Sequence, residues 1–458
     1  ADPAWAKFPF NLLAQSFITA AGLAREAVNG VPGTDAAAAN VVGFTVREGL
    51  ELLAPDNYLP TNPQLLHQTR AESGRNLVRG VKYLAEDVQR MLKGLGPVGV
   101  ENYQVGEQIA ASKGKVILRN SLMELIQYSP TTPKVYAEPV LIVPAWIMKY
   151  YILDLSPKNS LVKYLTDLGH TVFMISWTNP TAADRDVTMD DYLSLGVLTA
   201  LDAINKVVPK RKVHGVGYCI GGTLLAIAAA AMAQKEDDRL ATVTMFAAQT
   251  DFSEPGELSV FISPAQLAML EAMMWKEGVL ESRQMGGAFQ LLRTYDLLWA
   301  PTIGTYLRGE RVGVNDLMSW NADGTRMAYR MHTDYLHQLY LNNDLAEGRY
   351  VALGETLDLA AVEQPMFIVG TETDHVAPWK SVYKVGKLVH SKDYTFCLTS
   401  GGHNAGIISG PQHPKRRHRV LTMKAGARLP SPEQYLKKIE PAQGSWWPTF
   451  AAWLAGHS

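Results

Sequence analysis

The stretch that decides the fold covers residues 213 to 223 and reads Val213-His214-Gly215-Val216-Gly217-Tyr218-Cys219-Ile220-Gly221-Gly222-Thr223. Its first half is typical of a buried strand, and its second half opens a helix. Between them, Gly-x-Cys-x-Gly is the pattern of a nucleophile elbow with cysteine in place of serine. A side chain at Gly217 or Gly221 would collide with the flanking strand or helix. The pattern predicts that Cys219 stands on a sharp, strained turn; the alternative is a buried cysteine on an ordinary tight turn.

Short apolar runs alternate with helical segments after about residue 98. Continuous apolar runs are typical of strands buried on both faces, and their alternation with helices favours a mostly parallel, doubly wound sheet. The expected strands are 140–143, 171–175, 213–218, 243–246, 366–369 and 394–398. The regularity stops at about 251–357, where we expect an inserted helical cap. Its Met and Trp side chains either pack a core or form an apolar roof over a substrate channel.

The residues before this region predict helices. Apolar residues at helical spacing indicate helices over 11–28, 36–53 and 63–93, with a proline-rich turn before the third. The chain begins at Ala1 without an initiator Met, so we expect a truncated or tagged start. The predicted organisation is a helical N-terminal region over 1–97 and a catalytic domain over 98–458, with the cap inserted into the second.

Two loops carry candidate partners for the cysteine. Asp374 and His403 each follow a predicted strand, and loops after strands form the sites of open α/β sheets. The order nucleophile, acid, histidine is that of the α/β-hydrolase fold. We therefore assign Cys219 as nucleophile, His403 as general base and Asp374 as its partner. His375 competes for the role of base, but adjacent residues seldom meet in triad geometry.

An oxyanion hole needs two backbone N–H donors near the nucleophile. We expect one from Ile220, at the N-terminus of the helix, where the helix dipole helps to hold a negative oxygen. The other is expected from the loop 144–147, and either Trp146 or Ile147 could supply it. Cys397, the other of the two cysteines, lies inside an apolar run and is interpreted as an inert core thiol.

Composition excludes several classes of function. The charge is balanced, with 43 Lys+Arg against 44 Asp+Glu, so no overall field favours nucleic acid. The uncharged stretch 214–234 could span a bilayer by length, but its glycines favour a strand, a turn and a buried helix, so we expect no membrane span. Two cysteines cannot form a disulfide scaffold, which favours a reducing compartment.

The remaining sequence patterns give no sign of a cofactor. A Gly-rich phosphate loop and the spacings typical of metal ligands are missing from the sequence, so we expect no cofactor and no metal. The basic run 414–419 has two interpretations. It forms a solvated face, or it meets the phosphates of a nucleotide-bearing substrate.

Several stretches resemble the polyhydroxyalkanoate (PHA) synthases, and the resemblance covers nearly all of residues 55 to 410. The matching stretches are 119–128, 146–155, 170–177, 217–223 and 374–379. A single chain with its own helical N-terminal region is similar to the class I synthases, and Ala405 matches their pattern. The chain departs from the family at Asn404, where a branched residue is usual, and at 407–411, which lacks the usual Asn-Pro-Pro.

The resemblance implies polymerisation of 3-hydroxyacyl-CoA, chiefly (R)-3-hydroxybutyryl-CoA, into a polyester with release of CoA. Cys219 would hold the acyl group as a thioester, His403 would act as base, and Asp374 would orient His403 or assist the hydroxyl directly. The resemblance also implies a homodimer at the surface of cytoplasmic polymer granules, with granule-surface proteins as candidate partners. The alternatives are a thiol-dependent acyl-CoA or polyester hydrolase of the same fold, and a non-catalytic granule-surface protein.

Overall fold

The computed structural model describes residues 2–28, 31, 33 and 35–458. Residues 1, 29, 30, 32 and 34, which belong to the predicted N-terminal region, lie outside the described residues. The chain forms two compact units. The first comprises Ala1–Glu101, Leu258–Ser263 and Arg283–Met318, and the second comprises Asn102–Glu257, Pro264–Ser282 and Ser319–Ser458. Each unit therefore takes part of the segment predicted as a cap, and the predicted domain boundaries stay a prediction.

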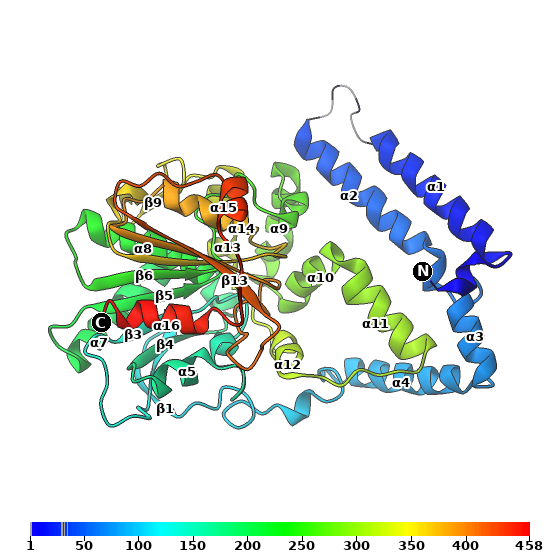
Figure 1. Cartoon of the computed structure of the whole chain (residues 1–458), viewed down its shortest axis with the longest axis horizontal. Helices are drawn as coiled ribbons and strands as arrows, with labels where there is room; N and C mark the ends of the chain where they lie inside the picture. Colours follow the sequence, from blue (N-terminus) through cyan, green and yellow to red (C-terminus); the bar gives the residue numbers. More distant parts are fainter. Residues whose placement is uncertain (1, 29–30, 32, 34) are drawn as a thin grey trace. The chain divides into compact units, whose positions relative to one another are not determined.

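The second unit is built on a ten-stranded sheet with the order β1-β2-β4-β3-β5-β6-β11-β12-β13-β14 (Figure 1). The strands are β1 (Gly114–Arg119), β2 (Met123–Tyr128), β3 (Val140–Val143), β4 (Val172–Trp177), β5 (Val213–Tyr218), β6 (Leu240–Phe246), β11 (Met366–Thr371), β12 (Asp393–Thr399), β13 (Arg417–Lys424) and β14 (Ala442–Gln443). The six strands from β4 to β12 in this order are parallel to their neighbours. These six are the predicted ones, so the mostly parallel sheet is confirmed.

The sequence did not predict the strands at the two edges of this sheet. β1 and β2 pair antiparallel at one edge, and β13 and β14 pair antiparallel at the other. Side chains of β1 and β13 are largely exposed or half-buried, so these strands lack the continuous apolar runs that marked the central ones. In particular, the basic run 414–419 contains the start of β13.

The register of the central strands aligns their carboxyl ends. Gly217 in β5 lies opposite Val143 in β3 and Met245 in β6. Farther along the sheet, Thr371 at the end of β11 lies opposite Thr399 at the end of β12. The loops after β5, β11 and β12 therefore leave the sheet at the same edge, although they are far apart in the chain.

Helices complete the second unit. They are α5 (Leu161–Asp167), α6 (Met189–Asp191), α7 (Thr199–Val207), α8 (Ile220–Gln234), α9 (Pro264–Glu277), α13 (Tyr329–Tyr335), α14 (Trp379–Tyr383), α15 (Pro432–Lys438) and α16 (Trp447–Ala455). The uncharged stretch 214–234 is part of β5, the turn and α8, as predicted, and α8 is buried from Ile220 to Met232. Among the described residues, no helix has the length and apolar character needed to cross a membrane.

The first unit is helical. Its helices are α1 (Phe10–Val28), α2 (Ala36–Leu53), α3 (Pro63–Ala71), α4 (Arg75–Leu92) and α11 (Ala300–Thr302), while α10 (Ser282–Leu292) and α12 (Asp316–Ala322) include residues of both units. The single helix predicted over 63–93 is wrong, because the chain breaks between α3 and α4 at Gly74, which has φ of +79°. Helical spacing of apolar residues continues through this break, which explains the error.

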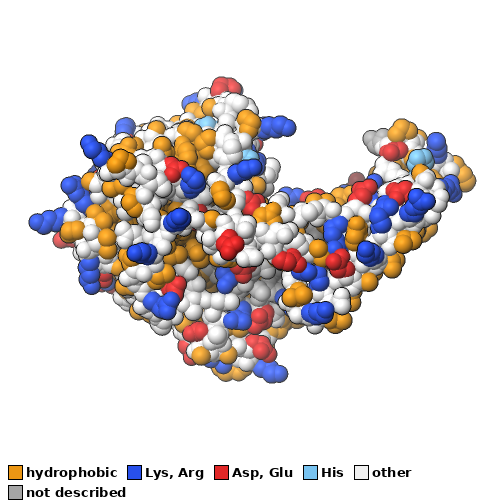
Figure 2. Space-filling model, turned by 90° about the horizontal axis from the view of Figure 1, so that it is seen from below, with side chains coloured by type: hydrophobic (Ala, Val, Ile, Leu, Met, Phe, Trp, Pro, Cys, Tyr) orange, Lys and Arg blue, Asp and Glu red, His pale blue; other side chains and the backbone are white. Residues whose placement is uncertain are grey.

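Figure 2 shows basic and acidic side chains interspersed over the face in view, with hydrophobic side chains between them. This mixture agrees with the nearly equal numbers of basic and acidic residues in the sequence, which predict no strong overall field.

Candidate active site

The turn between β5 and α8 holds Cys219 at the carboxyl edge of the sheet. This residue has φ of +53° and ψ of −131°, a conformation that residues with side chains rarely adopt. The Cys219 N–H donates to the carbonyl of Phe246 over 2.9 Å, so the end of β6 stabilises the turn. The thiol side chain is partly exposed. The structure thus places the predicted nucleophile on a strained turn.

The glycines around the cysteine permit two close approaches of backbone. A Cβ on Gly217 would lie 2.4 Å from Cα of Gly222 at the start of α8. A Cβ on Gly221 would lie 2.2 Å from the carbonyl oxygen of Val143 at the end of β3. Neither contact can be relieved by turning a side chain, because both neighbours are backbone. The helix can therefore begin directly against the sheet only with glycine at these positions.

Asp374 meets His403 in the next part of the site. Asp374 Oδ2 lies 2.8 Å from His403 Nδ1 and accepts from the Thr371 hydroxyl over 2.9 Å. Its Oδ1 accepts from the N–H groups of Val376 and Ala377 over 2.9 and 2.8 Å. The Asp374 side chain is 0% exposed. Burial opposes its ionisation, but the charge of His403 and these donors hold the pKa of Asp374 below its ordinary value.

His403 interacts with both the carboxylate and the thiol. Its Nδ1 lies 2.8 Å from Asp374 Oδ2, and the charge of a Cys219 thiolate acts on its imidazole. Burial disfavours a charged imidazole, yet the Asp374 carboxylate and a Cys219 thiolate raise the pKa of His403 well above its ordinary value. The structure therefore brings the three predicted residues together in one row. The imidazole that contacts Asp374 is that of His403, the one favoured over His375.

The candidate oxyanion donors lie on both sides of the cysteine. Ile220 is the first residue of α8, so the helix itself provides no partner for its N–H. Trp146 and Ile147 lie in the loop after β3, which Gly221 approaches closely. Thr325 Oγ1 donates to the carbonyl of Trp146 over 2.6 Å, and this contact holds the loop. The roles of these three N–H groups stay a prediction.

Aromatic residues lie close to the thiol. Burial raises the pKa of Tyr335 in α13 and of Tyr340 in the following π-helical segment Leu336–Leu341, and a Cys219 thiolate adds to both shifts. The ring centroids of Tyr340 and Phe252 are 4.8 Å apart, and those of Tyr340 and Tyr335 are 5.4 Å apart. These packed rings form an apolar cluster on the side of the site where the two tyrosines lie, and such surface limits the room for water.

The sequence did not predict the contacts that hold the loop after β12, which carries His403 and is called the histidine loop below. Arg416 donates to Ser409 Oγ over 2.9 Å and to the carbonyls of Ala405 and Ser400 over 3.3 and 3.4 Å. Burial lowers the pKa of this guanidinium. Asn404, the departure from the synthase pattern, accepts a hydrogen bond from the hydroxyl of Tyr218. The partners of Arg416 lie 7 to 16 residues away and those of the Tyr218–Asn404 bond 186 residues apart, and neither separation matches a local pattern that sequence spacing could reveal.

The basic run 414–419 has a structural role that neither interpretation anticipated. Arg417 and Arg419 form ion pairs with Glu372, at 2.7 and 3.2 Å. Glu372 lies in the loop that carries Asp374. Arg417 and Arg419 thus contact the loop that carries Asp374, and Arg416 contacts the loop that carries His403. All three side chains therefore have partners within the fold.

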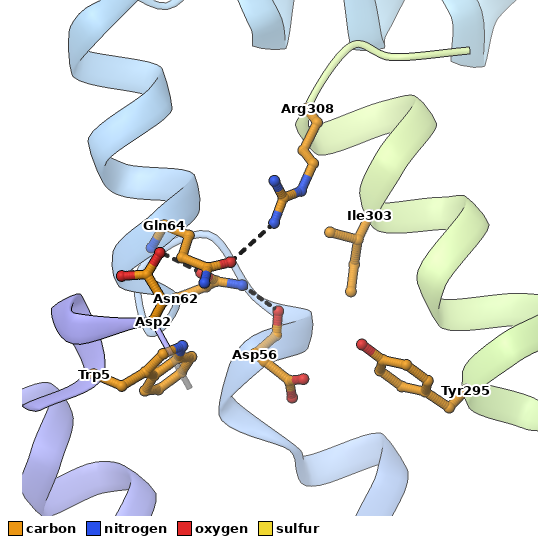
Figure 3. Close-up of a pocket in the computed structure, with 8 residues that line it drawn as sticks. All are labelled: Asp2, Trp5, Asp56, Asn62, Gln64, Tyr295, Ile303 and Arg308. Atoms are coloured by element: carbon orange, nitrogen blue, oxygen red, sulfur yellow. Dashed lines mark hydrogen bonds between the residues drawn. The ribbon is translucent and has the colours of Figure 1, made fainter. Parts of the chain in front are cut away.

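Two other features of the chain include none of these three residues. Cys397 is buried in β12, and burial raises the pKa of its thiol, as befits a core cysteine. A cavity of about 280 Å³ lies in the first unit (Figure 3), lined by Asp2, Trp5, Asp56, Asn62, Gln64, Tyr295, Ile303 and Arg308. It contains none of the predicted site residues. The described residues include no cluster of His, Cys, Asp and Glu arranged to hold a metal ion.

Comparison with known proteins gives two family matches. Residues 1–165 match the model of the poly-beta-hydroxybutyrate polymerase (PhaC) N-terminus. Residues 138–408 match the model of the alpha/beta hydrolase fold. The second match covers more than half of the chain and confirms the predicted fold class.

Curated relatives match over almost the whole chain. A poly(3-hydroxyalkanoate) polymerase of Methylorubrum extorquens is 39% identical over 98% of this chain and 74% of the relative. A poly(3-hydroxyalkanoate) polymerase subunit of Rhizobium etli is 38% identical over 100% and 71%, and that of Cupriavidus necator is 33% identical over 100% and 78%. Among solved structures, a monoglyceride lipase variant of Saccharomyces cerevisiae matches with a TM-score of 0.42 and 12% identity, over 78% of this chain and 99% of that one.

Proposed function

Because the chain belongs to the poly(3-hydroxyalkanoate) polymerase family, an acyltransferase family with the alpha/beta hydrolase fold, we propose that it polymerises 3-hydroxyacyl-CoA, chiefly (R)-3-hydroxybutyryl-CoA, through a thioester on Cys219. The observation that carries the proposal is the contact of His403 with the buried Asp374 carboxylate, together with the strained turn that holds Cys219 where a thiolate charge acts on the same imidazole. A partly exposed thiol beside an imidazole held by a buried carboxylate is suited to nucleophilic catalysis.

In the first step His403 takes the proton of the Cys219 thiol, and the thiolate attacks the carbonyl carbon of the acyl-CoA. The Ile220 N–H and the N–H of Trp146 or Ile147 hold the oxyanion that forms. The bond from the carbonyl carbon to the CoA sulfur then breaks, and His403 returns the proton to that sulfur. Because a thioester replaces a thioester, the acyl group keeps its activation.

In the second step the acyl group passes to an alcohol. His403 takes the proton of a 3-hydroxyl group, and the alkoxide attacks the carbonyl carbon of the Cys219 thioester. An ester bond forms and the bond to Cys219 breaks. The proton on His403 then returns to the thiolate, which restores the starting state.

The surroundings of Asp374 support a role in orienting His403. Its carboxylate is fully buried, and each oxygen accepts two hydrogen bonds. Direct assistance to the substrate hydroxyl would need an oxygen that faces the substrate. The proposal therefore assigns the proton transfers to His403 and charge stabilisation to Asp374.

A thiol-dependent hydrolase would use the same three residues, and access of water distinguishes the two activities. The aromatic cluster of Phe252, Tyr335 and Tyr340 beside the thiol favours transfer to an alcohol over hydrolysis. The meeting of Cys219, His403 and Asp374 also disfavours a non-catalytic granule-surface protein.

Further parts of the proposal rest on the resemblance to class I synthases. We propose a homodimer that works at the surface of cytoplasmic polymer granules, with granule-surface proteins as candidate partners. The reaction needs no cofactor besides the CoA that the substrate carries.

The test uses purified protein and (R)-3-hydroxybutyryl-CoA, with release of CoA followed by a thiol reagent and products separated by size. Cys219→Ala removes the nucleophile, and Cys397→Ala is the matched control because that thiol is buried in β12. We expect polyester of high mass from the unchanged chain and from Cys397→Ala, but none from Cys219→Ala. Free 3-hydroxybutyrate alone would identify a hydrolase, and polymer from Cys219→Ala would exclude the cysteine mechanism.

A further inference from the structure

We propose that Tyr218 and Asn404 are positioning residues whose shared hydrogen bond sets the geometry between the nucleophile and the base. Tyr218 directly precedes Cys219, and Asn404 directly follows His403. The Tyr218 hydroxyl donates to Asn404 Oδ1. The bond therefore connects the two loops at the residues next to the reacting groups. The inference rests on the proposed roles of Cys219 and His403.

Tyr218 is fixed on the side of the sheet. It is the last residue of β5, lies opposite Phe246 of β6, and is 2% exposed. Its ring centroid is 5.5 Å from that of His403, with an angle of 40° between the rings. Burial raises the pKa of the phenol well above its ordinary value, so the hydroxyl keeps its proton and donates.

Asn404 is fixed on the side of the loop. Its carbonyl accepts from the N–H groups of Ile407 and Ile408 over 3.0 and 3.1 Å, which closes a turn directly after His403. Arg416 holds the next residue by donating to the carbonyl of Ala405 over 3.3 Å. Arg416 and Tyr218 thus attach the histidine loop to two different parts of the sheet unit.

The bond matters because catalytic geometry tolerates displacements of only about 0.5 Å. Residues 218 and 404 are 186 positions apart, and a direct bond between them fixes the nucleophile loop against the histidine loop. Removing the hydroxyl would leave the Asn404 oxygen without this donor, and removing the amide would leave a buried phenol unpaired. Either change would loosen the spacing between the Cys219 thiol and the His403 imidazole.

The test compares Tyr218→Phe, Asn404→Leu and the double variant. Tyr383→Phe is the matched control, because it removes another buried phenol, which donates to the carbonyl of Pro430 over 3.0 Å. Two quantities are measured: kcat and KM for CoA release, and the rate at which iodoacetamide alkylates Cys219 as a function of pH. The alkylation measurement needs no substrate, and mass spectrometry of the Cys219 peptide distinguishes alkylation of Cys219 from that of Cys397.

We expect each single variant to lower kcat by about five- to tenfold, the size of one lost hydrogen bond, with KM little changed. The midpoint of the alkylation profile should shift in both. The double variant should be no slower than the slower single variant, because its second change removes a partner whose bond is already lost. Tyr383→Phe should leave kcat and the alkylation profile unchanged.

Losses that multiply in the double variant, or an unchanged alkylation profile, would overturn the proposal and leave Tyr218 a packing residue. If Tyr218→Phe does not fold, Asn404→Leu, at a half-buried position, tests the proposal alone. Its kcat and alkylation profile are then compared with those of Tyr383→Phe. The alkylation profile also separates this proposal from the proposed function. Polymer made by Cys219→Ala would refute the function, whereas an unshifted profile refutes only the positioning.

Discussion

Thr325 Oγ1 donates to the carbonyl oxygen of Trp146 over 2.6 Å. The same loop is also held where Trp320 Nε1 donates to the carbonyl of Lys149 over 2.8 Å. The segment around residues 320–325 therefore determines how the loop after β3 lies beside Cys219. If that loop supplies an oxyanion donor, loosening it should slow the reaction without changing the nucleophile.

Thr325→Val tests this relationship. The substitution keeps the shape of the side chain and removes the hydroxyl, so we expect kcat for CoA release to fall about five- to tenfold. Thr166→Val is the control, because Thr166 in α5 also donates its hydroxyl to a carbonyl, that of Lys163, over 3.0 Å. Full kcat in Thr325→Val would mean that this hydrogen bond does not set the geometry of the loop.

Gly221→Ala should damage the fold of the second unit. The added methyl group would lie 2.2 Å from the carbonyl oxygen of Val143, and overpacking against backbone costs about 3 kcal/mol or more. We expect loss of folded protein or a large fall in the free energy of unfolding, measured with denaturant. Gly43→Ala, in α2, meets no atom within 4 Å and should stabilise its helix by up to about 1 kcal/mol. Equal stability of the two variants would contradict the close approach.

Asp374→Asn should leave the fold intact and abolish most of the activity. The asparagine amide can keep the bonds from Val376 and Ala377, but its NH₂ group cannot accept from His403. We expect the rate of CoA release to fall by about two to four orders of magnitude, as in triads whose histidine takes the wrong tautomer. Asp238→Asn, at a carboxylate with 82% of its side chain exposed, is the control. A variant that retained more than about a tenth of the rate would exclude this role of Asp374.

Stability should fall in mild acid because of buried neutral histidines. Burial lowers the pKa of His332, His170 and His214 from the ordinary value to about 4. Their folded pKa lies below the unfolded value of about 6.5, so the unfolded chain binds more protons between these limits. The stabilisation is therefore complete above about pH 6.5 and is lost as the pH falls towards 4, by at most about 1.4 kcal/mol per pH unit for each histidine.

His332→Leu measures one part of this dependence. His332 is 4% exposed, and leucine removes the titrating group while filling similar space. We expect a shallower fall of the unfolding free energy between pH 7 and pH 5, measured with denaturant at each pH. His67→Leu, at an exposed position on α3, provides the comparison. Identical slopes for His332→Leu and the unchanged chain would refute the assignment to His332.

The central sheet, and the meeting of Cys219, Asp374 and His403 at its carboxyl edge, could be predicted because much of their signal is local. Buried parallel strands carry continuous apolar runs, and Gly-x-Cys-x-Gly encodes the turn within five residues. The antiparallel strand β13 was not predicted, since most of its residues are exposed or partly buried and it begins within a basic run. The charges of Arg417 and Arg419 suggested a solvated face or a phosphate contact and gave no sign of a strand.

Contacts between distant residues could not be predicted in the same way. Nothing near Tyr218 in the chain indicates that its hydroxyl meets Asn404, and nothing near Arg416 indicates that it holds Ala405. These partners are set by the register of β5, β6, β11 and β12, which depends on the packing of the whole sheet. The order of nucleophile, acid and histidine could be inferred because loops after parallel strands share one edge. The side-chain contacts that hold those loops in place became visible only in the structure.

The backbone conformation of Cys219 has a consequence for the life of the chain before it is folded. The angle of +53° is maintained only while the end of β6 and the glycines at 217 and 221 surround the turn. In an unfolded chain β6 does not lie beside β5, so the two cysteines have similar, solvated surroundings. The environment that is proposed to activate Cys219 therefore forms only when the sheet assembles, and it is lost if the sheet comes apart.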